Sequence, residues 1–173
     1  MPSLRTHWGC KFSPWFLSGL LLLSWGSISF ATDQIWTGAQ NTNWGNNTNW
    51  SGNAPSSSDN AKFNSTFSNQ PRVTGSTSVG GIWITGSIGQ NVTISASGGG
   101  TLTLQGNTIN GTAGLGILID NTNAFTLTIN ASLQVGNTQT WTNSSGNLLT
   151  ISGTLNLNNK ALTINGTGNQ SKN

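Results

Sequence analysis

The chain of 173 residues contains no Tyr and no Glu, and only one Cys, one His and one Met. Charged residues make up 5% of the sequence, whereas globular proteins average about 25%. Such a chain is a poor helix former, because Glu, Lys and Arg are among the residues that favour helices. The composition therefore argues against a helical bundle, a coiled coil and a Rossmann-type fold. Its many Gly, Asn, Thr and Ser residues are typical of short strands joined by turns.

The first residues are typical of a secretory signal peptide. Arg5 and Lys11 precede an apolar run at 17–28, and small residues follow up to Ala31. This order predicts a signal peptide over residues 1–31 that is cleaved after Ala31. The alternative, a membrane anchor, needs about 20 apolar residues, and this run is shorter and broken by Ser and Gly. We therefore expect a secreted or cell-surface protein with no membrane span in the mature chain.

Removal of this segment restricts the available chemistry. It takes away His7 and Cys10, the only His and Cys of the chain. A Ser-His-Asp triad, a Cys-His pair and a zinc site with nitrogen or sulfur ligands then become impossible. The three acids, Asp33, Asp59 and Asp120, are far apart in the sequence. We expect no enzyme activity, no catalytic residues, no cofactor and no metal.

The basic residues that remain are few and scattered. They are Lys62, Arg72, Lys160 and Lys172. Four bases and three acids leave a formal charge of +1. Nucleic-acid-binding domains instead gather Lys and Arg on one face, so we expect no nucleic-acid partner.

Residues 32–72 are rich in Trp and Asn and show no clear strand pattern. Their aromatic residues are Trp36, Trp44, Trp50, Phe63 and Phe67. One interpretation is a platform on which a sugar ring stacks. The other, which we favour, is a buried cluster that covers the open end of a sheet, because exposed Trp costs solubility and repeat proteins need a cap. We therefore expect an N-terminal cap over residues 32–72.

Residues 73–167 form a series of short segments in which aliphatic residues alternate with Thr or Asn. This alternation places the aliphatic side chains on one face of a strand. Three similar segments, 101–104, 126–129 and 149–151, return after about 22–25 residues, which suits one coil of a solenoid. The sequence predicts an all-β fold, a short-stranded β-solenoid (β-helix), with a β-sandwich as the alternative.

The solenoid hypothesis assigns the aliphatic residues to its interior. They are Ile82, Ile84, Val92, Ile94, Leu102, Leu104, Ile117, Ile119, Leu127, Ile129, Leu133, Val135, Leu149, Ile151, Leu155, Leu157, Leu162 and Ile164. At one strand spacing per coil, residues 80–167 make about four coils. We expect a disordered tail at 168–173 and an open strand edge around 161–167, through which the chain could associate with itself.

The opening segment resembles the start of bacterial proteins with autotransporter-associated β-strand repeats. The residues that carry the resemblance are Trp36-Thr37-Gly38, Asn43-Trp44, Asn49-Trp50-Ser51-Gly52, Pro55, Asp59 and Phe63. The later Gly-Thr-Leu-Thr-Leu segment at 100–104 is similar to the strand of their passenger repeat. The resemblance covers about residues 33–167 and implies a rod exposed at a bacterial surface. Because such proteins are usually much longer, we expect this chain to be a fragment or a truncated copy.

Three functions remain open at this point. The leading hypothesis is an exported, non-catalytic structural segment that supports adhesion at a cell surface. The alternative is a carbohydrate-binding module that contacts polysaccharide through Trp44, Trp50 and Trp83, with Trp36 and Trp141 as further candidates. A third is ice binding by rows of Thr on a flat face, with the pairs Thr101/Thr103, Thr126/Thr128 and Thr140/Thr142.

Overall fold

The computed structural model describes residues 31–120, 122 and 124–173, and their strands form three sheets. The first sheet contains, in order, β1 (Asp33–Ile35), β2 (Asn60–Phe63), β5 (Gly81–Ile84), β9 (Thr112–Ile119), β12 (Gln139–Asn143) and β15 (Leu162–Asn165), with β8 (Asn107–Ile109) beside β9. The second contains β3 (Arg72–Val73), β6 (Val92–Ala96), β10 (Leu127–Ile129), β13 (Leu149–Ile151) and β16 (Gln170–Lys172). The third contains β4 (Thr77–Val79), β7 (Thr101–Leu104), β11 (Ser132–Val135) and β14 (Leu155–Asn156). One short 3₁₀ helix, η1 (Asn47–Asn49), lies before β2.

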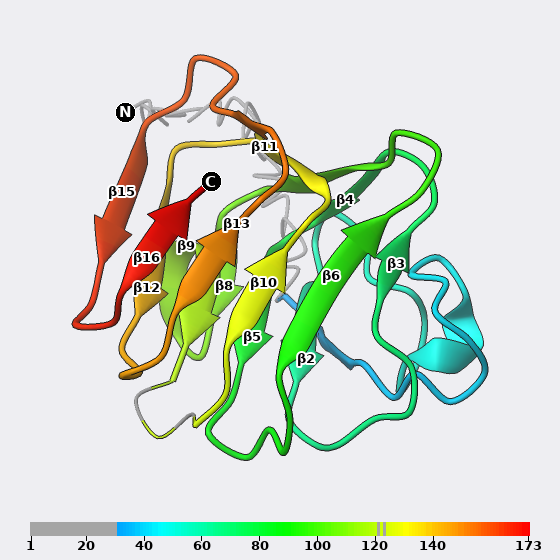
Figure 1. Cartoon of the computed structure of the whole chain (residues 1–173). Coiled ribbons are helices and arrows are strands. Elements are labelled where there is room, and N and C mark those ends of the chain that lie inside the picture. Colours follow the sequence, from blue (N-terminus) through cyan, green and yellow to red (C-terminus); the bar gives the residue numbers. More distant parts are fainter. Residues whose placement is uncertain (1–30, 121, 123) are drawn as a thin grey trace, which may run out of the picture.

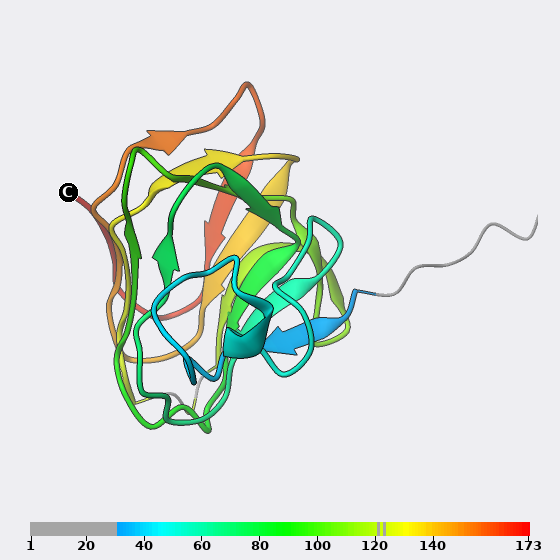
Figure 2. The same cartoon turned by 90° about the vertical axis from the view of Figure 1, so that its right-hand side faces the viewer.

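The chain visits the three sheets in turn, so that it winds into a β-solenoid of about six turns. Among the described strands, all ladders are parallel except the one between β8 and β9. Figure 1 shows the second sheet face-on, and Figure 2 shows the three sheets around one interior. The prediction of an all-β solenoid is confirmed, and the β-sandwich alternative is wrong because a sandwich is built from antiparallel sheets.

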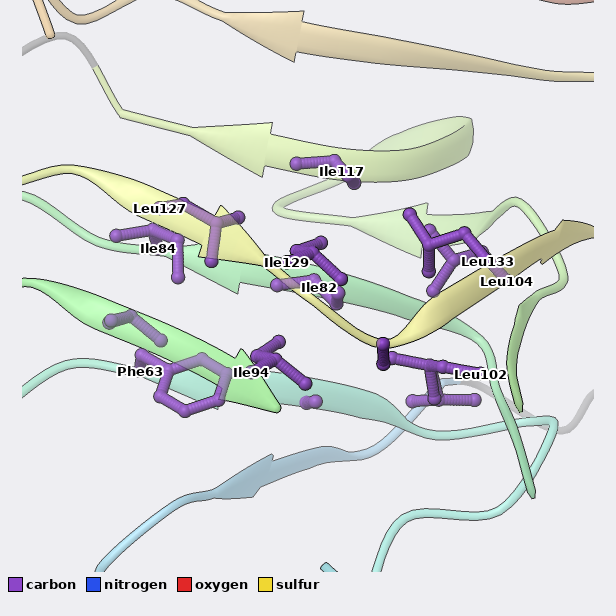
Figure 3. Close-up of a cluster of buried hydrophobic side chains, with 14 of the residues drawn as sticks. Phe63, Ile82, Ile84, Ile94, Leu102, Leu104, Ile117, Leu127, Ile129 and Leu133 are labelled. Atoms are coloured by element: carbon purple, nitrogen blue, oxygen red, sulfur yellow. The ribbon is translucent and has the colours of Figure 1, made fainter. Parts of the chain in front are cut away.

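The interior is filled by aliphatic residues that stack from coil to coil. Ile94, Ile129 and Ile151 occupy one column of the second sheet, because the strands pair in register. All three are buried. In the close-up of Figure 3, buried side chains from the three sheets point toward the same interior. The alternation read from the sequence therefore does place the aliphatic side chains inside.

The last coil differs from those beneath it. Ile164 lies in register with buried Trp141 but is 51% exposed, and Leu157 is 43% exposed. Leu155 and Leu162 are half-buried. All four residues were predicted to be interior. Leu155, Leu162 and Ile164 do line the hollow at the end of the core, but no further coil of the described structure covers them. Leu157 lies beyond the end of β14, and its prediction is wrong.

One strand assignment implied by the repeat spacing is wrong. β10 and β13 do pair, with Leu127 opposite Leu149, 22 residues on. The segment Thr101–Leu104, however, belongs to the third sheet and pairs with β11. The hairpin of β8 and β9 lengthens this coil and shifts the apparent repeat. Its turn, Asn110-Gly111, has positive φ at both residues, +48° and +78°, which a type I′ hairpin turn requires and which Asn and Gly adopt most readily.

The ladder begins within the segment predicted to be a separate cap. β1 and β2 lie in residues 32–72 and pair with the rest of the first sheet. Their pattern was missed because these strands are short and carry Asn60 and Lys62 beside the buried Ala61 and Phe63. The solenoid is therefore longer than the four coils counted from residue 80.

The predicted disordered tail also contains a strand. β16 pairs with β13, so that Gln170 and Lys172 continue columns filled by Leu149 and Ile151 in the coil beneath. Polar residues are tolerated there because no further coil of the described structure covers them, and their polarity hid the strand in the sequence.

The predicted signal peptide, residues 1–31, lies outside the described residues apart from Ala31. Within the described part of the chain, no helix has both the length and the apolar character needed to cross a membrane.

Candidate functional site

The aromatic residues of the opening segment form one buried cluster at the first coil. The ring centroid of Trp50 lies 4.9 Å from those of both Trp36 and Trp44, in edge-to-face contact. Phe63 continues the cluster, 6.4 Å from Trp50 and 6.0 Å from Phe67. Edge-to-face packing at these distances is the favoured geometry for aromatic pairs. The cluster joins the aliphatic core and closes its N-terminal end.

Two of the three indole N–H groups of the cluster bond backbone carbonyls, and that of Trp44 is buried with no hydrogen-bond partner among the described residues. Trp36 Nε1 donates to the Asn69 carbonyl at 2.8 Å, and Trp50 Nε1 donates to the Trp44 carbonyl at 2.7 Å. Trp44 and Trp50 are only 2% and 4% exposed. Neither ring can therefore stack on a sugar, and the carbohydrate-binding prediction for these two residues does not hold. The buried-cluster interpretation describes them correctly.

The cluster segment also covers two strand edges. Residues 42–44 form backbone hydrogen bonds with β3. The backbone N–H of Arg72 donates to the Thr42 carbonyl at 2.6 Å, and the backbone N–H of Trp44 donates to the Arg72 carbonyl at 2.9 Å. Ser51 bonds the outer edge of β1, since its N–H donates to the Ile35 carbonyl at 2.8 Å. Unpaired edges template association with other strands. The N-terminal end of the solenoid is thus blocked in two of its three sheets.

Trp83 is the predicted stacking residue that does face outward. It lies on β5 between the buried Ile82 and Ile84 and is half-buried. The Lys62 ammonium sits 3.8 Å from the centroid of its ring. Its Nε1 donates to Asp120 Oδ1 at 3.1 Å. One ring face and the N–H group are therefore already occupied by neighbours within the chain.

The charges around Trp83 form a row across the first sheet. Lys62 Nζ lies 3.1 Å from Asp33 Oδ2, and Asp120 bonds the Trp83 indole at the far side. The backbones of β1 and β9 are about 14 Å apart at three strand spacings. Lys62 and the Trp83 indole lie between the two carboxylates and contact them. The row is thus a set of stabilising contacts in which each carboxylate already has a partner within the chain.

The third acid is engaged elsewhere. The Asp59 carboxylate accepts a hydrogen bond from the Ser56 N–H at 3.0 Å and another from the Ser56 hydroxyl, in the turn before β2. Within residues 31–120, 122 and 124–173, no group of three or more His, Cys, Asp and Glu is placed to hold a metal ion.

A hollow of about 220 Å³ lies beside Trp44, on the side of Val73 and Thr74. Two larger hollows lie elsewhere on the surface of the described residues. One, of about 410 Å³, is lined by polar side chains and a glycine, namely Ser57, Ser58, Gln105, Gly106, Asn107 and Asn137. Its side chains already bond within the chain, as Asn107 does to the Ser58 carbonyl at 2.7 Å. Sequence reasoning missed this groove because its residues come from three separate coils.

The other hollow opens on the last coil and is mainly apolar. Its volume is about 260 Å³, and it is lined by Trp141, Leu149, Ile151, Leu155, Leu162, Ile164, Gln170, Ser171 and Lys172. Trp141, a further candidate for sugar stacking, is 2% exposed and donates its N–H to Gln139 Oε1 at 3.1 Å. The hollow thus lies over the last coil of the described residues.

The Thr pairs predicted for a flat ice-binding face do not share one. Thr101 and Thr103 lie in the third sheet, Thr128 in the second, and Thr140 and Thr142 in the first. Their strands face three directions around the solenoid. The ice-binding hypothesis is therefore wrong in the arrangement on which it rested.

No family model matches the chain, and no curated protein or solved structure is similar to it at a significant level.

Proposed function

We propose that this chain is an exported, non-catalytic structural segment of a surface or secreted protein of autotransporter type, and that it supports adhesion. The supporting observation is the continuous column of buried aliphatic residues through the coils, as in Ile94, Ile129 and Ile151. Such a stack is held by burial and by ladder hydrogen bonds, and it needs neither disulfides nor charge. These properties suit a rod that projects from a cell.

The three acids of the described chain fit this role. Asp33 pairs with Lys62, Asp120 bonds Trp83, and Asp59 closes a turn. Each carboxylate stabilises the chain around it. In this proposal the outer faces of the solenoid supply contacts to a cell surface or to polysaccharide, and neither nucleic acid nor a cofactor takes part.

Export is tested by expressing the full chain in a Gram-negative bacterium and measuring the mass of the protein recovered outside the cytoplasm. The expected mass corresponds to a chain that begins at Thr32. A control with Leu21→Arg and Leu22→Arg, which interrupts the apolar run, should stay in the cell at full length. Recovery of the uncut chain from the cytoplasm alone would contradict the proposal.

Adhesion is tested with beads coated with the mature chain and allowed to settle on cells and on polysaccharide films. Retention of the beads under flow is expected. A matched coating of Ile129→Asp, which places a carboxylate in the core column and should unfold the rod, should lose it. Equal retention by both coatings would show that the fold has no part in adhesion.

The carbohydrate-binding alternative now depends on Trp83 alone. Lys62 covers one ring face, so a sugar that stacks on this ring must displace it. If sugar does so, Lys62→Met should tighten binding and shift the Trp fluorescence further, while Trp83→Phe should weaken both effects. Absence of any fluorescence change with soluble polysaccharides would exclude this use of Trp83.

A further inference from the structure

The polar hollow of about 410 Å³ lies at the corner where the chain passes from the third sheet to the first. Gln105 and Gly106 join β7 to β8, and Asn137 lies between β11 and β12. Backbone hydrogen bonds connect the coils at this corner, as when the Gly106 N–H donates to the Gly80 carbonyl at 2.9 Å. From Ser58 to Asn137 the hollow therefore crosses three strand spacings, about 14 Å.

Two asparagines of the hollow are held in place by their side-chain N–H groups. Asn107 Nδ2 donates to the Ser58 carbonyl at 2.7 Å, and it passes so close to Gly80 that a Cβ there would lie 2.5 Å away. Asn137 Nδ2 donates to the Gln105 carbonyl at 3.0 Å and to Gln105 Oε1 at 3.3 Å. Because a carbonyl oxygen only accepts, these contacts assign the nitrogen and the oxygen of both amides. Neither Oδ1 atom has a partner among the described residues, so each is a free acceptor in a fixed position.

Gln105 adds a donor to the same hollow. Its Oε1 accepts from Asn137, and its Nε2 has no partner within residues 31–120, 122 and 124–173. The side chain lies against Gly136, where a Cβ would be 2.4 Å from Oε1. Beneath it, the buried Gln139 donates from Nε2 to the Asn137 carbonyl at 3.1 Å and supports that backbone. The hollow thus presents two acceptors and one donor that need little rearrangement when a ligand arrives.

We infer that this hollow binds an uncharged oligosaccharide through its hydroxyl groups. The inference rests on the proposed adhesive role and names the site and the class of polysaccharide. A hydroxyl both donates and accepts, so neighbouring sugar hydroxyls can donate to Asn107 Oδ1 and Asn137 Oδ1 and accept from Gln105 Nε2. No lining residue is charged, so a charged group would lose water without gaining a partner. The length of about 14 Å exceeds that of one sugar ring and favours a chain of sugars.

This site is separate from the stacking on Trp83 considered above. Its lining contains no aromatic ring, so the affinity comes from neutral hydrogen bonds, each of which contributes little in water. The expected dissociation constant is on the order of 1–10 mM. Weak single contacts suit adhesion, because many copies of the chain act together on one surface.

An NMR titration of the folded chain tests the site. The probes are soluble tetrasaccharides of glucose, xylose, mannose and N-acetylglucosamine, with tetragalacturonate as the charged comparison. At least one neutral probe should shift the side-chain NH₂ signals of Gln105, Asn107 and Asn137. Unchanged signals with every neutral probe at about tenfold above the expected dissociation constant, or shifts with tetragalacturonate alone, would overturn the inference.

Two variants and a matched control locate the binding. Asn137→Ala should weaken binding about 3- to 10-fold, because it removes one acceptor and frees the Gln105 side chain. Gln105→Met, which keeps the length of the side chain without its polar atoms, should weaken binding by a similar factor. Asn130→Ala removes an exposed amide just after β10 in the second sheet and should leave the constant unchanged. Equal effects of Asn137→Ala and Asn130→Ala, in chains with the wild-type circular dichroism spectrum, would show that sugar binds elsewhere.

Retention of coated beads separates this inference from the proposed function. If no soluble probe binds and wild-type beads still hold to polysaccharide films, the hollow is not the site and the adhesive role stands. If the signals of the hollow respond to a neutral probe but the beads are not retained, the site stands and the adhesive role fails.

Discussion

The Lys62 ammonium lies 3.8 Å from the centre of the Trp83 ring and 3.1 Å from the Asp33 carboxylate. These three residues stand on β1, β2 and β5, so one lysine links three successive coils on the outer face of the first sheet. Register places Lys62 directly opposite Trp83. These contacts stabilise the packing of the first coils of the solenoid against one another.

Lys62→Met should therefore destabilise the fold by about 0.5–2 kcal/mol, the range for a partly exposed cation–π contact with a weak ion pair. The measurement is the free energy of unfolding in urea, at low and at high salt. The ion-pair share should shrink at high salt, since screening weakens exposed charges. Lys160→Met, at an exposed turn position, is the control and should change little; an equal loss in both variants would contradict the role given to Lys62.

The core column predicts a contrast between two isoleucines. Ile129→Ala should cost about 2–5 kcal/mol, because the side chain is buried between Ile94 and Ile151 and its loss leaves a cavity. Ile164→Ala should cost well under half as much, because Ile164 is 51% exposed. Both are measured as unfolding free energies at the same protein concentration. Similar losses would show that the two positions share one environment, contrary to the structure.

The strands of the later coils could be predicted from the sequence because period-two alternation is a local property. In Leu127–Ile129 and Leu149–Ile151 the order aliphatic, Thr, aliphatic fixes the inward face without knowledge of the partner strand. Their spacing of 22 residues correctly predicts the length of the coil that joins these two strands. The spacing did not place Thr101–Leu104 in the correct sheet, because the β8–β9 hairpin changes the coil length and alternation alone does not say which sheet a strand joins.

The candidate site was only partly predictable for a similar reason. Burial of Trp44 and Trp50 followed from the cost of exposing them. Their hydrogen bonds, such as that of Trp44 to the Arg72 carbonyl, join residues far apart in the chain and depend on the register of the coils. The contact of Lys62 with Trp83 depends on the same register, which the short first strands did not reveal.

The aromatic cluster predicts that Trp50 contributes strongly to the stability of the fold. Trp50→Ala should cost about 3–5 kcal/mol, since it removes a buried ring that contacts Trp36, Trp44 and Phe63. Thermal unfolding followed by circular dichroism measures the loss. Trp83→Ala is the matched control, because its ring is half-buried on the outer face and should cost less. If Trp83→Ala proved the more damaging change, the cluster would not be the closure of the core.

Close approach of two coils gives the last prediction. A Cβ at Gly153 would lie 2.0 Å from the Ala131 carbonyl oxygen, a backbone atom of the coil beneath. Gly153→Ala must therefore push the coils apart where β13 turns toward β14, and it should destabilise the chain by about 1–3 kcal/mol or more, the range for overpacking a well-packed site.

Gly146→Ala is the control, because a Cβ there meets no atom within 4 Å and the φ of Gly146 is not positive. That variant should be neutral or slightly stabilising, since alanine restricts the unfolded chain. The comparison is made by urea unfolding, and a Gly153→Ala chain as stable as Gly146→Ala would mean that the coils stand further apart at this corner than the structure places them.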